Sequence, residues 1–536
     1  MSWGHIESDD LVVWKPAEIS PALLPDEPYD QEGVFTGCWI PNVNESDETI
    51  RIAYSSVKQL PFHWSTPPYP RNAAGISVAS SSDGGVTWKK SPRNPILLGE
   101  PAGVQVTGFR DPYVMQSSEL DRILGADTKG LYGLVSGGVE GSGPTTWLYT
   151  ISPDDLESWA YVCPLVDILA RHQPFEPWGG NYGVNWECTN LLSLSFGKIT
   201  RQFLILGAEG DVEKAHVKHF IGSPESPSRT VRAQLWMSGP LSATKNGPRL
   251  QYKHGGYLDH GPFYAANSLL DLTNERHIVH GWIPEEDITL NHAKRKGWNG
   301  SMALPREIFL LYIPMVVGAL RTKLGDITSF EIYEELDGSC SVLTLGVKPI
   351  AEMAELRGSC GWTCTLGSPL NMNRKDKNLF DLRSTSWELE MVVSLHESCE
   401  TLGFHIYLGE NRSCRTTVTF SVVEEMLIVD RHESNGDITI NKCPDAGPFT
   451  LLWMKQSDTR DALVLEALRL RIFSDGDILE VFANDRFALT TMVYAEHQDS
   501  TAGTICAFAT GRGEYGATLE SARLWDGLGW DKHVQG

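Results

Sequence analysis

The sequence predicts an all-β protein in which a five-bladed β-propeller is followed by a C-terminal β-sandwich. Three observations lead to this prediction: a weak repeat with a period near 70 residues, strand-like segments throughout, and a change of pattern near residue 350. At 536 residues, the chain is also longer than one ordinary hydrophobic core supports, which favours two domains.

The repeat consists of an acidic turn that ends in a tryptophan. It occurs at 8–14, 82–88 and 152–159, and its closing tryptophans are 74 and 71 positions apart. The aspartate of such a turn bonds the backbone, and the tryptophan packs between neighbouring sheets. This period suits a large propeller blade, and three unrelated turns are the alternative.

The second half of the chain has a different pattern. Helical periodicity is convincing mainly at 349–357. Alternating segments such as 387–395 and 478–482 follow it, as is typical of a sandwich. We therefore expect three parts: a propeller with an incomplete first blade at 1–347, a linker helix at 348–358 and a sandwich at 359–536.

Composition narrows the classes of partner. A net charge of -23 disfavours nucleic acid and anionic membranes. The longest apolar run, Ile308 to Leu320, has 13 residues and includes Pro314, so it is too short to span a bilayer. Seventeen tryptophans suit a protein that stacks sugar rings, although most tryptophans are core residues. We expect a small carbohydrate partner; homodimer formation stays open.

Cysteines and glycosylation sequons give weaker evidence, on cofactors and on location. Cys360 and Cys364 lack a second pair at zinc-site distance, so we expect neither a metal nor another cofactor. Sequons at Asn44, Asn299 and Asn411 match chance frequency, and no signal peptide opens the chain, which slightly favours an intracellular location.

Two acidic motifs carry the chemistry. Phe109 to Pro112 contains Arg110 and Asp111, and Trp186 to Cys188 contains Glu187, 76 positions after Asp111. Glycoside hydrolysis uses such carboxylates: one protonates the leaving oxygen, and others stabilise or attack the oxocarbenium-like sugar. A general acid needs a raised pKa, which partial burial and nearby carboxylates provide.

These motifs resemble two of the three signatures of glycoside hydrolase family 32, which cleaves and transfers fructosyl groups. The stretches 60–65 and 136–143 are similar to fungal β-fructofuranosidases and fructosyltransferases. The resemblance implies that Glu187 is the general acid/base and that Asp111 stabilises the transition state. It also implies a substrate-binding set: Arg110, Glu209, Phe35, Thr36, Trp64, Asp259, Tyr264 and Trp298.

The third signature, an Asn-Asp-Pro-like stretch with the nucleophilic aspartate, does not occur in the sequence. Asp9, Asp10 and Asp26 are poor substitutes, because none has that setting. Two explanations stay open: a reading frame that starts at an internal methionine of a longer enzyme, or a truncated paralogue. Both predict little fructosidase activity for the chain as written.

The sequence thus predicts a retaining glycosidase for β-D-fructofuranosides such as sucrose and short fructo-oligosaccharides. Water as acceptor would make it an invertase, and a sugar acceptor would make it a fructosyltransferase. The alternatives are a catalytically impaired sugar-binding paralogue and, less favoured, a related propeller glycosidase that acts on arabinan.

Overall fold

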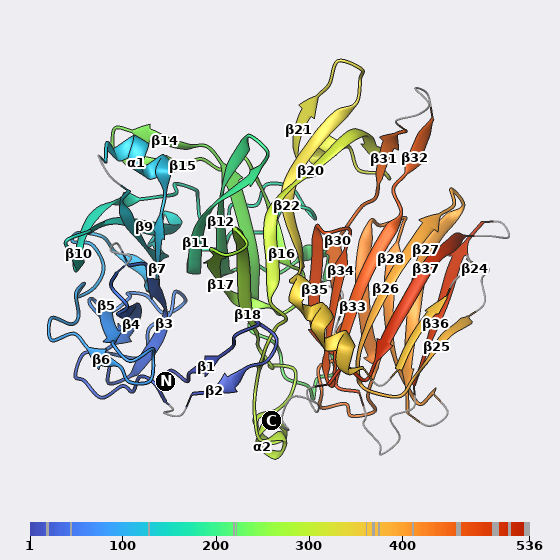
Figure 1. Cartoon of the computed structure of the whole chain (residues 1–536), viewed down its shortest axis with the longest axis horizontal. Coiled ribbons are helices and arrows are strands. Elements are labelled where there is room, and N and C mark those ends of the chain that lie inside the picture. Colours follow the sequence, from blue (N-terminus) through green and yellow to red (C-terminus); the bar gives the residue numbers. More distant parts are fainter. Residues whose placement is uncertain are drawn as a thin grey trace.

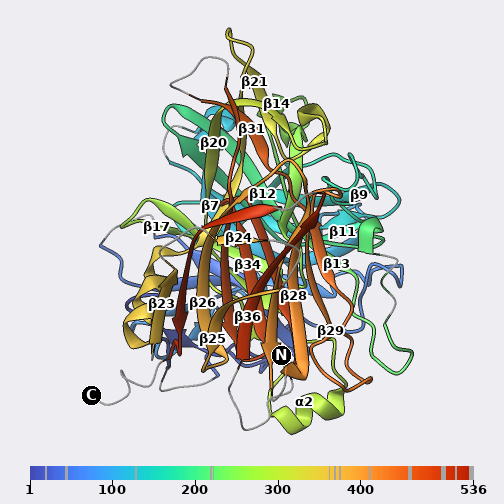
Figure 2. The same cartoon turned by 90° about the vertical axis from the view of Figure 1, so that its right-hand side faces the viewer.

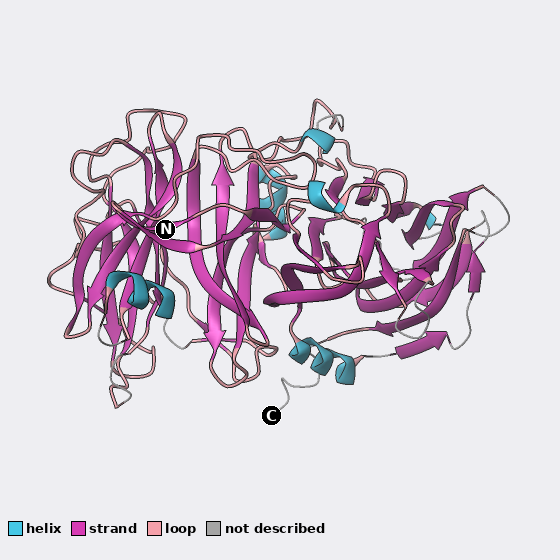
Figure 3. Ribbon diagram, turned by 90° about the horizontal axis from the view of Figure 1, so that it is seen from above, coloured by secondary structure: helices cyan, strands magenta, loops and turns pink. Residues whose placement is uncertain are grey.

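A computed structural model describes the chain in thirteen stretches. They are residues 1–17, 21–42, 46–126, 129–217, 220, 222–360, 362–366, 370–372, 376–409, 412–456, 462–495, 503–512 and 516–529. Two lobes lie side by side, a propeller coloured blue to yellow and a sandwich coloured orange to red (Figure 1). The view from above separates the same two lobes (Figure 3). The predicted all-β class, a propeller followed by a sandwich, is confirmed.

Four antiparallel sheets form the blades. The first three follow the chain order from the inner strand outward, whereas in the fourth β22 pairs with β20 and β21 lies outside it. Blade 1 has β3 (Gly33–Ile40), β4 (Ile50–Val57), β5 (Ala74–Ser81) and β6 (Lys89–Lys90); blade 2 has β7 (Val106–Gln116), β8 (Leu131–Val139), β9 (Gly143–Ser152) and β10 (Asp155–Pro164). Blade 3 has β11 (Asn185–Phe196), β12 (Ile199–Glu209), β13 (Arg232–Gly239) and β16 (His254–Asp259). Blade 4 has β17 (Tyr264–Asp271), β18 (Arg276–Ile283), β20 (Arg306–Ala319), β22 (Cys340–Pro349) and β21 (Glu331–Glu334), with β19 (Ser301–Met302) beside β18.

The inner strands β3, β7, β11 and β17 contact one another in turn around the axis. Asn267 on β17 donates a 3.0 Å hydrogen bond to the carbonyl of Gly37 on β3, which joins the last blade to the first. A two-stranded sheet of β1 (Ile6–Glu7) and β2 (Lys15–Pro16) lies beside that junction. Trp3 packs on Tyr54 of blade 1, and Trp14 packs on His280 of blade 4. The described residues therefore form four full blades and this two-stranded fragment.

The repeated turns behave as their chemistry predicts. The Asp10 carboxylate accepts hydrogen bonds from the backbone N–H groups of Val12 and Val13. Asp83 accepts from Thr87 N–H, and Asp155 accepts from Glu157 N–H. Each acidic turn of the repeat is therefore fixed by its own aspartate.

Two antiparallel sheets make the sandwich, which faces the viewer in Figure 2. One contains β23 (Trp362–Leu366), β37 (Ala517–Asp526), β26 (Ser386–Leu395), β33 (Leu468–Asp475), β34 (Ile478–Ala483), β35 (Phe487–Met492) and β24 (Leu370–Met372). The other contains β25 (Lys377–Leu382), β36 (Gly503–Gly511), β27 (Cys399–Leu408), β28 (Cys414–Ser421), β29 (Met426–Glu433) and β30 (Asp445–Pro448). Aliphatic and aromatic side chains of both sheets share one buried core.

One strand from the C-terminal region also joins the propeller. β31 (Leu452–Lys455), which pairs with β32 (Leu463–Leu465), adds to β20 of blade 4. The apolar run at 308–320 forms most of β20, which is a strand of 14 residues. No helix in the described stretches is long and apolar enough to cross a membrane.

The remaining elements are short. They are the hairpin β14 (Leu241–Thr244) and β15 (Gly247–Leu250), the helices α1 (Ser118–Leu124) and α2 (Leu290–Lys296), and 3₁₀ helices at Ala215–Val217, Leu324–Asp326 and Ala351–Ser359. The last of these helices connects the two lobes, near the predicted linker helix at 348–358.

Candidate active site

Backbone irregularities aim the functional side chains into the centre of the propeller. The register of β7 shifts between Arg110 and Tyr113, and that of β11 shifts between Glu187 and Asn190. Within these bulges Asp111 has a φ of 59° and Cys188 a φ of 48°. A positive φ is costly for a residue with a Cβ atom, and bulges of this kind redirect side chains next to active sites. The strain therefore coincides with the two predicted catalytic motifs.

Arg110 gathers three carboxylates. Its Nε and Nη2 lie 2.9 and 2.6 Å from Glu187 Oε1. Its Nη2 also lies 3.2 Å from Glu209 Oε2, and its Nε lies 3.9 Å from Asp111 Oδ2. The Arg110, Asp111 and Glu209 side chains are 5–7% exposed, whereas that of Glu187 is 20% exposed. Glu187 is thus the acid that an incoming molecule can reach.

Neighbouring groups fix each carboxylate. The Tyr264 hydroxyl donates to Glu187 Oε2 at 2.8 Å, so both oxygens of Glu187 have a protein partner. Asn185 donates to Glu209 Oε2 at 3.0 Å. The backbone N–H of Cys188 donates to Asp111 Oδ2 at 3.2 Å, which ties one catalytic motif to the other.

The protonation pattern differs from the prediction for Glu187. Burial, supported by the negative charge of Glu187, raises the pKa of Asp111 to about 7. Burial pushes the pKa of Glu187 upward too, but the charge and hydrogen bonds of Arg110 and the Tyr264 hydroxyl outweigh it and lower that pKa. The expected raised pKa of Glu187 is therefore wrong for the free site, where burial instead raises the pKa of Asp111 and that of Glu209. If Glu187 is the general acid, a bound substrate must raise its pKa.

The structure brings most of the predicted residues to this cluster. Phe35 packs on Phe62, whose ring lies 5.7 Å from the Arg110 guanidinium. The backbone carbonyl of Thr36 accepts a hydrogen bond from Ser55, whose hydroxyl in turn accepts from Asp111 N–H.

Trp64 also lies close to the cluster. Its ring is near Gly210, the residue after Glu209, so a Cβ atom at position 210 would lie 3.4 Å from it. Trp64 and Phe35 therefore both lie beside the Arg110 cluster.

Asp259 lies elsewhere, and its predicted substrate contact is wrong. Its carboxylate pairs with Arg306 at 2.6 Å and accepts from Thr490 N–H and Oγ1 at 3.1 and 2.8 Å. The residue is 1% exposed. Because both oxygens are bound within the interface between the lobes, Asp259 joins the domains and cannot reach a sugar.

Trp298 packs on a lysine that also contacts the sandwich. Its side chain is half exposed, and Lys296 Nζ lies 3.6 Å above its ring. Lys296 in turn pairs with Glu285 and with Asp477 of the sandwich. The structure thus places Trp298 at the boundary between the lobes.

Sequence reasoning missed Arg232. On β13, Arg232 stands directly opposite Glu209 of β12, and its guanidinium lies 5.3 Å from the Tyr264 ring. No motif surrounds it in the sequence, and only the strand register could have identified it. Burial and the positive charge of Arg110 lower the pKa of His63, the residue before Trp64, although the negative charge of Glu187 opposes this shift.

The three aspartates considered as substitute nucleophiles do not enter the cluster. Asp9 and Asp10 belong to the first acidic turn, where Asp10 bonds the backbone. Asp26 pairs with Lys90 at the edge of blade 1. In the described part of the chain, the carboxylates that pair with Arg110 are Asp111, Glu187 and Glu209.

Family models match both lobes of the chain. Residues 1–315 match the glycosyl hydrolases family 32 N-terminal domain, and residues 354–526 match the family 32 C-terminal domain. The chain belongs to glycoside hydrolase family 32.

The names of its relatives refer to the cleavage of fructans or sucrose phosphate. A fructan 6-exohydrolase of Beta vulgaris is 26% identical over 58% of this chain but only 45% of its own length. The chain therefore spans less than half of that relative. A sucrose-6-phosphate hydrolase of Zymomonas mobilis is 22% identical over 98% of this chain and 84% of its own.

Solved structures share the whole fold. A β-fructofuranosidase of Aspergillus kawachii superposes with a TM-score of 0.86 at 27% identity, covering 99% of this chain and 89% of the other. A fructosyltransferase of A. japonicus has a TM-score of 0.83 at 24% identity, covering 98% and 90%. At 24% identity, the similarity to the fructosyltransferase supports a shared fold alone.

Proposed function

We propose that the chain acts on β-D-fructofuranosides such as sucrose and short fructo-oligosaccharides. The observation that carries this proposal is the cluster in which Arg110 holds Asp111, Glu187 and Glu209 at the centre of the propeller. Membership of a glycoside hydrolase family and the names of the relatives support the same substrate class.

In this proposal Glu187 donates its proton to the glycosidic oxygen while the bond from that oxygen to fructosyl C2 breaks. Asp111 and Arg110 bind hydroxyls of the flattening ring, so their contacts strengthen in the transition state. Glu187, now ionised, then takes a proton from the water or sugar hydroxyl that attacks C2. Water yields hydrolysis, and a sugar hydroxyl yields fructosyl transfer.

A retaining double displacement further requires a carboxylate nucleophile about 5–5.5 Å from the acid. The described carboxylates of the cluster are all held by Arg110, and Asp9, Asp10 and Asp26 lie outside it. This observation favours a second candidate function, a protein that keeps the fructosyl pocket and binds sugars but cleaves them slowly.

One paired experiment separates the two. Calorimetric titration with D-fructose measures binding, and fructose release from sucrose and 1-kestose measures turnover of the same purified chain. Turnover that Glu187→Gln abolishes supports the glycosidase. Binding without turnover supports the sugar-binding protein, and the absence of both would refute the shared proposal.

A further inference from the structure

Arg232 lies close to Glu187, and its positive charge helps to lower the pKa of that residue. Arg110 binds Glu187 Oε1, whereas the Tyr264 hydroxyl binds Oε2. The Arg232 guanidinium lies 5.3 Å from the Tyr264 ring and 5.7 Å from the Trp282 ring. In the proposed mechanism Glu187 protonates the oxygen that carries the leaving sugar, so that sugar lies next to Glu187 and near Arg232.

This guanidinium is suited to bind hydroxyls. Its side chain is 22% exposed, and its ion pair with Glu286 spans 3.4 Å, which is loose for a charged hydrogen bond. A planar guanidinium carries five N–H donors in a fixed fork, more than Glu286 alone can use. The two aromatic rings hold the plane of the fork in place.

The backbone before Arg232 is attached to a neighbouring loop. Thr230 donates its N–H and its hydroxyl to the two Glu286 oxygens at 2.8 and 2.9 Å. Arg229 binds both oxygens of Asp287, at 2.6 and 2.7 Å. Arg232 is the first residue of β13, and Arg229 holds the segment before it in position.

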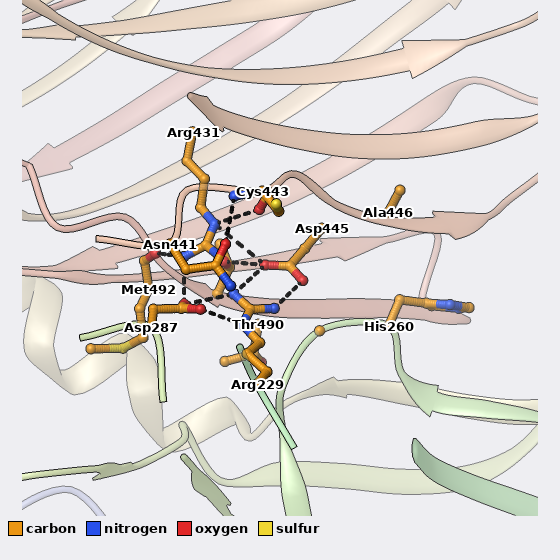
Figure 4. Close-up of polar contacts among 12 residues, drawn as sticks. Arg229, His260, Asp287, Arg431, Asn441, Cys443, Asp445, Ala446, Thr490 and Met492 are labelled. Carbon is orange, nitrogen blue, oxygen red and sulfur yellow. Dashed lines mark hydrogen bonds and ion pairs between the residues drawn. The ribbon is translucent and has the colours of Figure 1, made fainter. Parts of the chain in front are cut away.

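The sandwich completes the attachment of Arg229. Asp445 on β30 binds its Nη1 and Nη2 at 2.6 and 3.1 Å. Arg431 on β29 binds Asp287 at 2.8 Å, so two arginines and two aspartates alternate across the domain boundary (Figure 4). Arg431 is 0%, Asp287 3% and Asp445 9% exposed. Such a closed and neutral network holds its members in one arrangement.

We infer that Arg232 determines the affinity for the sugar beyond the scissile bond, and that the sandwich positions it through Asp445 and Arg229. This inference rests on the proposed fructoside function. Asp445 touches no substrate, so it is a positioning residue for a binding site in the other lobe.

The test compares D-fructose with sucrose, because sucrose adds the sugar beyond the bond. Calorimetry on the full chain gives both affinities at a temperature where turnover is slow, and Glu187→Gln serves as the background where turnover interferes. Arg232→Gln should weaken sucrose binding about tenfold and leave fructose binding nearly unchanged, because a charged donor to the sugar is lost. Asp445→Asn should lower the sucrose-to-fructose affinity ratio in the same direction by about threefold.

A double variant separates positioning from general loosening. If Asp445 acts through Arg232, then Arg232→Gln with Asp445→Asn should lower the ratio no further than Arg232→Gln alone. Glu331→Gln is the matched control, since it breaks the Arg201–Glu331 ion pair on the propeller, and it should leave the ratio unchanged. Should Asp445→Asn fail to fold, Arg229→Lys keeps the charge and loses the fork, with the same expected direction.

Each outcome of this test either supports or overturns one part of the inference. An unchanged ratio in Arg232→Gln overturns the role of Arg232, and additive losses in the double variant overturn positioning by Asp445. Fructose binding by the wild-type chain would show in both cases that the proposed pocket itself stands. If the wild type binds neither sugar, the proposed function and this inference fail together.

Discussion

Two arginine–carboxylate clusters in this molecule use the same residue types, but the pKa of Asp111 is raised in one and that of Asp445 is lowered in the other. Around Arg110, one guanidinium faces three carboxylates, and the pKa of Asp111 rises to about 7. At the domain boundary, Arg229 and Arg431 face two carboxylates, and the two arginine charges lower the pKa of Asp445 to about 2 against the effect of its burial. Because both aspartates are buried, the different ratio of arginines to carboxylates accounts for the opposite shifts.

The two clusters also differ in side-chain exposure and in backbone strain. Glu187 is 20% exposed and lies beside a residue with positive φ, whereas Asp287 and Asp445 are less exposed and lie in unstrained backbone. A cluster with excess negative charge is costly in a folded protein, and such costs are typical of functional sites. The neutral cluster adds stability and alignment. Variants in the two clusters should therefore affect different measurements.

Glu187→Gln should have the largest effect. It removes the reachable acid and should lower the rate of fructose release from sucrose by about 10²–10⁴-fold. The thermal unfolding midpoint should stay close to that of the wild type, since the amide keeps the shape of the side chain. Near-normal turnover in the variant would assign the acid role to another residue.

Asp287→Asn should instead affect stability. It leaves the fully buried Arg431 and the partly exposed Arg229 against Asp445 alone, which costs about 3–5 kcal/mol of unfolding free energy. Urea unfolding monitored by tryptophan fluorescence measures this loss. Glu331→Gln, which breaks a more exposed ion pair, should cost about 1 kcal/mol or less. Equal losses in both variants would contradict the distinction between the clusters.

Asp111→Asn should lower kcat by about 10²–10³-fold with little change in KM, because its contacts tighten as the sugar ring flattens. Steady-state kinetics over a range of sucrose concentrations separates the two parameters. A variant that raised KM alone would make Asp111 an ordinary binding residue.

The smallest effect concerns pH. Between about pH 4 and 7 the folded state keeps a proton on Asp111 that the unfolded state has lost, so this group makes stability fall as pH rises. Asp445 has the opposite sign: its contribution is present above about pH 4 and disappears as pH falls towards 2.

Unfolding free energies at several pH values check both signs. Asp111→Asn should flatten the decline between pH 4 and 7, and Asp445→Asn should flatten the loss below pH 4. The same curve in the wild type and in both variants would contradict the assigned pKa directions.

The sequence predicted what depends on local chemistry. Asp10, Asp83 and Asp155 fix their own turns, and the Arg110 and Glu187 motifs meet because both belong to inner strands. The class of fold and the family followed from such signals.

What it could not predict depends on contacts between distant strands. Asp259 was expected at the sugar, but Arg306, 47 positions away, takes its carboxylate into the domain interface. The pKa of Glu187 was expected to rise, but Arg110, 77 positions away, lowers it. Arg232 has no motif at all, and only its register opposite Glu209 marks it.

The most direct test of the central claim is a crystal structure of the chain with bound D-fructose. We predict the fructosyl ring within hydrogen-bond distance of Arg110 and Asp111, with the Glu187 carboxyl next to the anomeric oxygen. Fructose bound away from this cluster, or a cluster that stays free of sugar at a concentration where calorimetry shows saturation, would contradict it.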